Sequence, residues 1–200
     1  MNKLMRKYYT FINRRKFAKV GKKCRFYGGD IEVEGNVEVG DYVHIRDHCV
    51  FRTRGEGRIV FKERSMVSWN VTIESGQLVE IGENTGLAEG VIIRDGTHLI
   101  YGTKEHWRFT PFIIKPTIIG PNCWIGSRAY INYGVTIGEG AVIGVGSIVT
   151  KNVGPYEVWA GAPAKYVAHR TDDVPPSKLA EAQELLARHG IRKDRRMDDE

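Results

Sequence analysis

Six histidines and three cysteines are the side chains in this sequence best suited to move a proton or to act as a nucleophile near neutral pH. The histidines are His44, His48, His98, His106, His169 and His189. His98 ends the segment RDGTH, directly before a long stretch without regular hydrophobic spacing. A neutral imidazole in that position can take a proton from an attacking hydroxyl group. General base chemistry at His98 would require rigid elements that hold the imidazole beside a binding site.

The number and spacing of the cysteines argue against thiol and metal chemistry. Cys24, Cys49 and Cys123 lack the spacing of a metal site, and any disulfide would leave one of them unpaired. We therefore predict no bound metal and a reducing compartment, the cytoplasm.

Charge is concentrated at one end of the chain. The chain has 200 residues, of which 42% are hydrophobic, and this is enough for one domain with a core. Its net charge is +6, yet residues 1–23 alone contain nine Lys or Arg and no acidic residue. The basic charge belongs to a terminal arm, so we expect no nucleic acid as partner. Residues 1–23 form either a solvated helix face or, as the alternative, a weak contact with a membrane surface. No apolar run approaches the roughly 20 residues of a membrane span, and residues 1–23 lack the apolar core of a secretory signal.

The elements that would position His98 follow from a period of six residues. The clearest series of branched aliphatic residues is Ile119, Ile125, Ile131, Ile137, Ile143 and Val149. Compact residues follow four positions later, at Cys123, Ala129, Val135, Ala141 and Ser147. Neither a helix nor an alternating strand has this period. A triangular coil does, with three short strands per turn and one aliphatic side chain inside on each face, so the sequence predicts an all-β solenoid.

The same period occurs upstream in shifted frames. The series are Val33, Val39, Ile45 and Phe51, then Phe61, Val67 and Ile73, then Ile81, Leu87 and Ile93. The frame slips between Phe51 and Phe61 and again between Ile73 and Ile81, which predicts short bulges at those corners. Cys49 and Cys123 fall in compact inward positions, where a thiol acts as a small hydrophobic group and not as a nucleophile. The stretch 99–115 interrupts the pattern and predicts an extruded, functional loop.

Both ends of the solenoid need covering. Residues 1–29 predict a basic N-terminal helix or arm. Residues 169–200 predict a short amphipathic helix containing Leu179, Ala182, Leu185 and Leu186, with Gly190 as its stop, and then a tail.

Residues 116–167 carry a more specific signal. They contain WIGS, GVTIG, GVGSIVTK and AGAPAK in this order. The segment resembles the C-terminal half of the acetyl-CoA-dependent galactoside, maltose and polysaccharide O-acetyltransferases, which are hexapeptide-repeat acyltransferases. The resemblance implies a left-handed parallel β-helix over residues 30–168 and a homotrimer with active sites between subunits.

The resemblance also implies roles for individual residues. His98 corresponds to the catalytic base and Asn70, in SWNVTI, to an acceptor-binding residue. Trp124 would lie beside the pantetheine arm and the catalytic histidine. The coenzyme A contacts would be Ser127, Val145, Thr150, Lys151 and Lys165. Lys165 stands where the family often has Arg, which replaces a bidentate phosphate contact with a point charge.

The resemblance implies acetyl transfer from acetyl-CoA to a sugar or polysaccharide-precursor hydroxyl, with His98 as base and without an acyl-enzyme. His106, in the loop, is the competing base. An antibiotic acetyltransferase is the second hypothesis, followed by an amino-sugar N-acetyltransferase and a non-catalytic scaffold. A γ-type carbonic anhydrase is disfavoured because it needs two zinc histidines five residues apart, whereas His44 and His48 are four apart.

Overall fold

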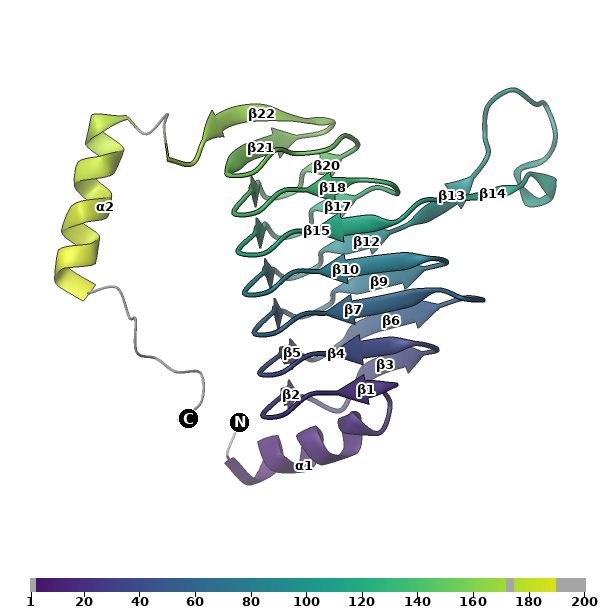
Figure 1. Cartoon of the computed structure of the whole chain (residues 1–200), viewed down its shortest axis with the longest axis horizontal. Coiled ribbons are helices and arrows are strands. Elements are labelled where there is room, and N and C mark those ends of the chain that lie inside the picture. Colours follow the sequence, from purple (N-terminus) through teal and green to yellow (C-terminus); the bar gives the residue numbers. More distant parts are fainter. Residues whose placement is uncertain (1–2, 172–174, 190–200) are drawn as a thin grey trace.

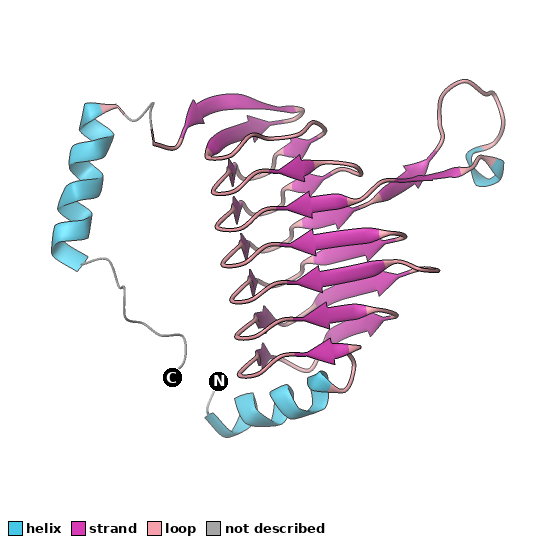
Figure 2. Ribbon diagram, viewed as in Figure 1, coloured by secondary structure: helices cyan, strands magenta, loops and turns pink. Residues whose placement is uncertain are grey.

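The computed structural model describes residues 3–171 and 175–189. Its body is a three-sided solenoid in which each turn adds one short strand to each of three sheets (Figure 1). Helix α1 (Lys3–Arg14) lies across the N-terminal end, and helix α2 (Pro176–His189) stands apart from the coils (Figure 2). The predicted β-solenoid with a helix at each end is confirmed. The left hand stays a prediction, and Gly190 lies outside the described residues.

The strands form three faces, named A, B and C. Face A contains β1 (Lys19–Val20), β4 (Val37–Val39), β7 (Arg58–Phe61), β10 (Leu78–Ile81), β15 (Thr117–Ile119) and β18 (Thr136–Ile137). Face B contains β2 (Arg25–Tyr27), β5 (His44–Arg46), β8 (Met66–Val67), β11 (Gly86–Leu87), β16 (Trp124–Ile125), β19 (Val142–Ile143), β21 (Glu157–Gly161) and β22 (Ala164–His169). Face C contains β3 (Ile31–Glu34), β6 (Cys49–Thr53), β9 (Thr72–Ser75), β12 (Ile92–Arg94), β17 (Tyr130–Ile131) and β20 (Ile148–Val149). Neighbouring strands are parallel except at the final pair, β21 and β22.

The register explains the six-residue period. On face C, Ile93 pairs with Ile131 and Ile131 with Val149, so residues of the same hexad position stack along the axis. Faces A and B have the same arrangement, and every aliphatic residue of the clearest series is buried. Burial of such a side chain stabilises the fold by about 1.5–3 kcal/mol. The compact residues, such as Ala129, are buried beside the corners.

The corner between faces B and C shows why particular residues end each strand. Asn70 has a φ of +57° and Gly146 a φ of +67°, both in the left-handed region that Asn and Gly tolerate best. Their backbone N–H groups donate to the carbonyl groups of Asp47 and Ser127, one coil earlier. These bonds tie each corner to the preceding one.

The solenoid begins earlier than the hexads predict. β1 and β2 complete a first coil from Lys19, whereas the pattern places residues up to 29 in the arm. Val20 and Phe26 are six residues apart, but Val33 follows Phe26 by seven, so this coil is out of frame. Phe26 is nevertheless fully buried and pairs in register with Ile45.

The extruded segment also starts before the predicted loop. β13 (Gly96–His98) pairs antiparallel with β14 (Phe112–Ile114), which makes a ribbon that leaves the solenoid after β12. A short 3-10 helix, η1 (Trp107–Phe109), lies in the connecting loop. The ribbon projects from the edge between faces C and A (Figure 1). Both predicted frame slips fall at this same edge.

Candidate functional site

His98 lies at the outer end of β13, opposite Phe112 of β14. Its half-buried ring makes edge contacts with Trp107, at 5.1 Å between ring centroids, and with Phe112, at 5.0 Å. Nδ1 of His98 is buried and has no hydrogen-bond partner within the described part of the chain. A buried polar atom without a hydrogen-bond partner lowers the stability of the fold unless another group forms a hydrogen bond with it. The ring is therefore held by aromatic contacts, and its buried Nδ1 is left unpaired.

Asp95 anchors the ribbon that carries His98. Its carboxylate is buried and accepts hydrogen bonds from the hydroxyl of Ser75 and from the backbone N–H groups of Gly76, Gln77 and Leu78, at 2.7–2.8 Å. Its own carbonyl accepts from the N–H of Lys115, where the chain returns to the solenoid. One carboxylate thus joins the ribbon to the turn between β9 and β10. The sequence analysis missed Asp95, although an acidic residue between a buried strand and a long loop was a usable signal.

A pocket of about 520 Å³ opens beside this anchor. Its polar lining includes Arg52, Arg54, Glu74, Arg94, Asp95 and His98. Its apolar wall comes from Phe112 and Ile114 of β14. Arg94 pairs with Glu74 at 3.4 Å, and the buried Nε of Arg94 has no partner among the described residues. The exposed lining of the pocket is mostly apolar, and arginine and glutamate side chains add polar groups beside the His98 imidazole.

Asn70, Ser127 and Val145 lie at the opposite edge of face C. Each sits at the corner between faces B and C: Asn70 two coils before Ser127, and Val145 one coil after it. Neighbouring coils are about 5 Å apart, so Asn70 and Ser127, two coils apart, are separated by about 10 Å along the axis. The Ser127 side chain hydrogen-bonds Glu89 and is the largest cause of the lowered pKa of that carboxyl. Val145 is exposed.

The remaining predicted contacts are divided between the two edges. Thr150 and Lys151 are exposed at the C–A edge, two coils beyond Arg94 and on the same side as the ribbon. Lys165 is exposed on β22. Trp124 projects outward from face B, and its ring lies over Gly86, where a Cβ atom would approach it to 2.8 Å. Within one chain the structure does not bring Asn70 or Trp124 to His98.

His106 has a structural position. Its Nδ1 accepts a 3.2 Å hydrogen bond from the N–H of Arg108, which caps η1, and its ring stacks against Trp107. His48 is exposed and its pKa is raised by the hydrogen bond to Asp30. His44 is buried, and desolvation and neighbouring arginines lower its pKa to about 4. Neither lies on the ribbon.

The cysteines occupy the interior. Cys24, Cys49 and Cys123 are free and buried. Burial raises all three thiol pKa values, that of Cys49 to about 12, which leaves them protonated and unreactive at neutral pH. Their inward placement agrees with the hexad interpretation. Across residues 3–171 and 175–189, no group of three His, Cys, Asp or Glu side chains could hold a metal ion.

The repeat segment and most of the chain are similar to known acetyltransferases. Residues 116–151 match the family described as the hexapeptide repeat of succinyl-transferase. A probable acetyltransferase of Mycobacterium tuberculosis is 30% identical over 150 residues, covering 72% of this chain and 50% of that protein. The galactoside O-acetyltransferase of Escherichia coli is 39% identical over 106 residues, covering 52% and 51%. The chain therefore carries the hexapeptide repeat in residues 116–151 and is similar to acetyltransferases.

Solved structures share the fold of this chain. An N-acyltransferase from Bacillus cereus, solved with an amino-sugar nucleotide and coenzyme A, superposes with a TM-score of 0.72. It covers 90% of this chain and 95% of its own, at 16% sequence identity. The chain spans about half the length of the curated relatives it matches.

Proposed function

We propose that the protein transfers an acetyl group from acetyl-CoA to a hydroxyl group of a sugar or polysaccharide precursor, with His98 as the general base. The observation that carries this proposal is the position of His98, on an anchored ribbon and in the lining of a pocket that also contains arginine and glutamate side chains. The family resemblance and the galactoside O-acetyltransferase relative favour a sugar hydroxyl over an amine.

The chemistry needs one proton carrier. His98 accepts the proton of the acceptor hydroxyl while that oxygen attacks the thioester carbonyl carbon. When the carbon–sulfur bond breaks, His98 returns the proton to the departing sulfur, so the products are an acetyl ester and free coenzyme A. General base catalysis of this kind supplies about 10²–10⁴ in rate. No acyl-enzyme is required, consistent with the buried, protonated thiols.

The distribution of the remaining residues supports a site between two copies of the chain. One chain offers His98, Thr150 and Lys151 at one edge of face C, and Asn70, Ser127 and Val145 at the other. A cyclic assembly would bring unlike edges together, so that each site takes its base from one subunit and its acceptor contact from the next. We propose a homotrimer on this basis, with Lys151 and Lys165 toward the phosphates of coenzyme A.

The test is thiol release from acetyl-CoA with free sugars, nucleotide sugars, lipid-linked glycans and hydroxylated antibiotics as acceptors. His98→Ala should lower kcat by about 10²–10⁴ without abolishing acetyl-CoA binding, measured by calorimetry. His106→Ala is the matched control, because it removes a histidine from the same extruded segment, and it should retain activity. Absence of both acceptor-dependent release and acetyl-CoA binding would overturn the proposal, and release with antibiotics alone would move the acceptor to the second hypothesis.

A further inference from the structure

Helix α1 covers the first coil with one face and is fixed there. Asn13 is fully buried, and its side-chain amide donates to the carbonyl groups of Gly28, at 2.6 Å, and Tyr9, at 2.9 Å. Phe17, just after the helix, is buried and stacks on Phe26 with 5.1 Å between ring centroids. These contacts set the rotation of the helix on the end of the solenoid.

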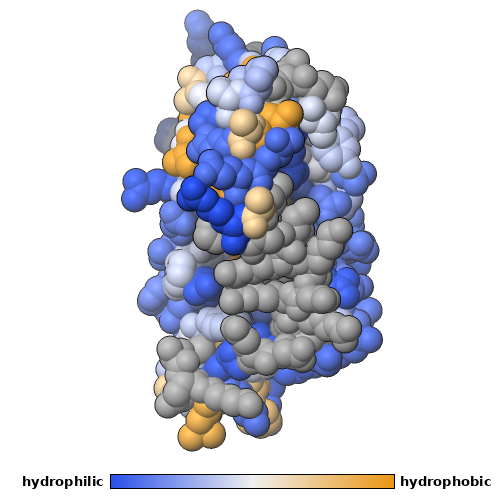
Figure 3. All heavy atoms as spheres, turned by 90° about the vertical axis from the view of Figure 1, so that its left-hand side faces the viewer, coloured by the Kyte–Doolittle hydropathy of each residue, from blue (hydrophilic) through white to orange (hydrophobic). Residues whose placement is uncertain are grey.

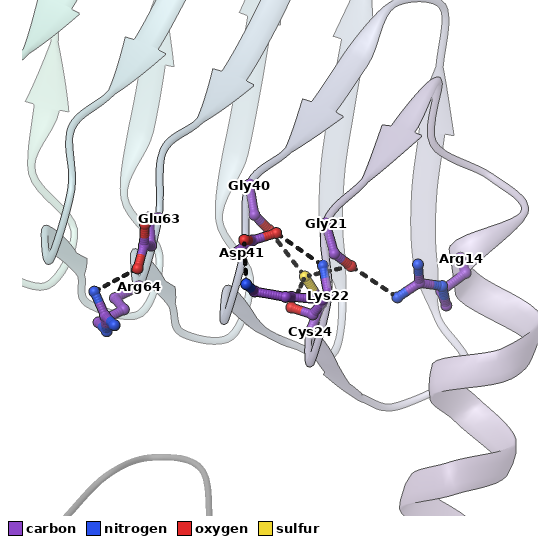
Figure 4. Close-up of polar contacts among 8 residues, drawn as sticks. All are labelled: Arg14, Gly21, Lys22, Cys24, Gly40, Asp41, Glu63 and Arg64. Atoms are coloured by element: carbon purple, nitrogen blue, oxygen red, sulfur yellow. Dashed lines mark hydrogen bonds and ion pairs between the residues drawn. The ribbon is translucent and has the colours of Figure 1, made fainter.

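Basic side chains at the end of the helix complete the anchor. Arg14 donates to the carbonyl groups of Gly21 and Val20, at 3.0 and 3.1 Å, so that it spans from the helix to the first coil (Figure 4). Lys16 donates to the carbonyl of Ile31 at 2.7 Å. The face of α1 that points away from the coils is therefore a fixed surface of the molecule.

That outward face is apolar where a capping helix would normally be polar. Leu4, Tyr8 and Phe11 are 76%, 56% and 58% exposed. Their spacing of four and three residues places them in one stripe along the helix. Hydrophobic atoms are visible at this end of the molecule (Figure 3). A continuous exposed stripe of large side chains marks a surface that contacts another apolar phase.

Basic side chains flank the stripe, although Lys22 of the first coil pairs with Asp41 at 3.6 Å. Lys7 is exposed on the helix, and the guanidinium group of Arg15, one residue past the end of the helix, lies 4.5 Å from the centroid of the Phe11 ring. Lys19, Lys22 and Lys23 follow on the first coil, and residues 1–23 contain no acidic side chain. Leucine and aromatic side chains among basic residues match the boundary between anionic headgroups and acyl chains.

We propose that α1 docks the protein onto a lipid bilayer that contains anionic phospholipids, with Leu4, Tyr8 and Phe11 inserted at the headgroup boundary. No helix among the described residues is long and apolar enough to cross a bilayer, so the helix would lie in the plane of the surface. A second copy of the chain fits less well, because three side chains fall short of the roughly 800 Å² per partner of a standard interface. The like charges would also repel across such a contact.

Vesicle co-sedimentation tests this proposal without using the catalytic activity. The wild-type protein should sediment with vesicles of phosphatidylcholine and phosphatidylglycerol but not with phosphatidylcholine alone, and binding should weaken as salt is raised. The variant Leu4→Ser/Tyr8→Ser/Phe11→Ser should lose binding by about tenfold or more. The charge variant Lys7→Glu/Arg15→Glu should lose a similar amount on anionic vesicles.

Two controls separate the helix from other apolar surfaces. Phe109→Ser removes a side chain that is 77% exposed on the extruded loop, and Leu179→Ser removes one that is 49% exposed on α2. Both should bind anionic vesicles like the wild type. Equal binding by wild type and the triple serine variant would overturn the proposal, and so would loss of binding in either control alone. A change of oligomer mass in the triple variant without lipid, measured by light scattering, would assign the stripe to a second copy instead. If the triple serine variant unfolds, the test rests on the charge variant: unchanged binding of Lys7→Glu/Arg15→Glu to anionic vesicles would then overturn the proposal.

Discussion

The buried carboxylate of Asp95 accepts a 2.7 Å hydrogen bond from the hydroxyl group of Ser75, one coil earlier. This contact and three backbone hydrogen bonds to the same carboxylate lie three residues before His98. The orientation of the proposed base thus depends on a side chain that need not touch either substrate. Asp95 is a positioning residue, and its loss should affect both folding and the alignment of the imidazole.

Asp95→Asn should lower the free energy of unfolding by about 2–4 kcal/mol, because an amide NH₂ would face N–H donors in a buried site. Urea unfolding followed by tryptophan fluorescence measures this change. Ser75→Ala is the milder comparison, with an expected loss of about 1 kcal/mol, since it removes one of four donors. In the folded Asp95→Asn protein, kcat should fall while KM for acetyl-CoA changes little. Stability within about 0.5 kcal/mol of the wild type would contradict the role of Asp95 as an anchor.

His44 makes stability depend on pH. Burial and the charges of Arg25, Arg6 and Arg46 lower its pKa to about 4 in the folded protein, whereas an unfolded histidine has a pKa near 6.5. Above pH 6.5 neither state binds the proton, and the group has no effect. As the pH falls from 6.5 to 4, the unfolded state gains the proton first, so stability decreases by about 1–3 kcal/mol. Urea midpoints measured at pH 7 and pH 4.5 should differ less in His44→Gln, and an identical slope in both proteins would show that other groups cause the acid sensitivity.

The aliphatic stack on face C provides a stability test of the six-residue period. Ile131 is fully buried between Ile93 and Val149, so Ile131→Ala should cost about 2–5 kcal/mol. Ile100→Ala, at a side chain 75% exposed on the loop, should change stability by less than about 0.5 kcal/mol. Chemical denaturation of the two variants compares them directly, and equal losses would mean that burial does not determine the hexad pattern.

The fold could be predicted because a stacked coil repeats one local rule. Ile131 occupies its position for the same reason as Ile93 and Val149, and each new coil supplies the same signal. The first coil was not predicted because the six-residue spacing is interrupted there: Val33 follows Phe26 by seven residues. The site is harder to predict, because Asp95 and Ser75 meet across coils and no local pattern joins them.

The relation between Asn70 and His98 could not be predicted from their spacing either. The turns between β9 and β10 and after β12 decide at which edge each residue emerges, and they have irregular lengths. In one chain the two residues lie at opposite edges of face C, which is about 13 Å wide over the four residues of β9. A site that uses both must draw them from different copies.

Mixed trimers test this last point. We expect His98→Ala and Asn70→Gly each to be nearly inactive alone; Gly is chosen because it accepts the positive φ of Asn70 without strain. Co-expression with two different tags and purification through both would give trimers that contain both variants. Every such trimer has one interface that joins an intact His98 to an intact Asn70, so activity should recover to about one third of the wild type. Trimers of wild-type and His98→Ala chains serve as the reference for the effect of tagging. Mixed trimers no more active than either parent would show that the two residues do not meet across subunits, and the site would then belong to the His98 edge of a single chain.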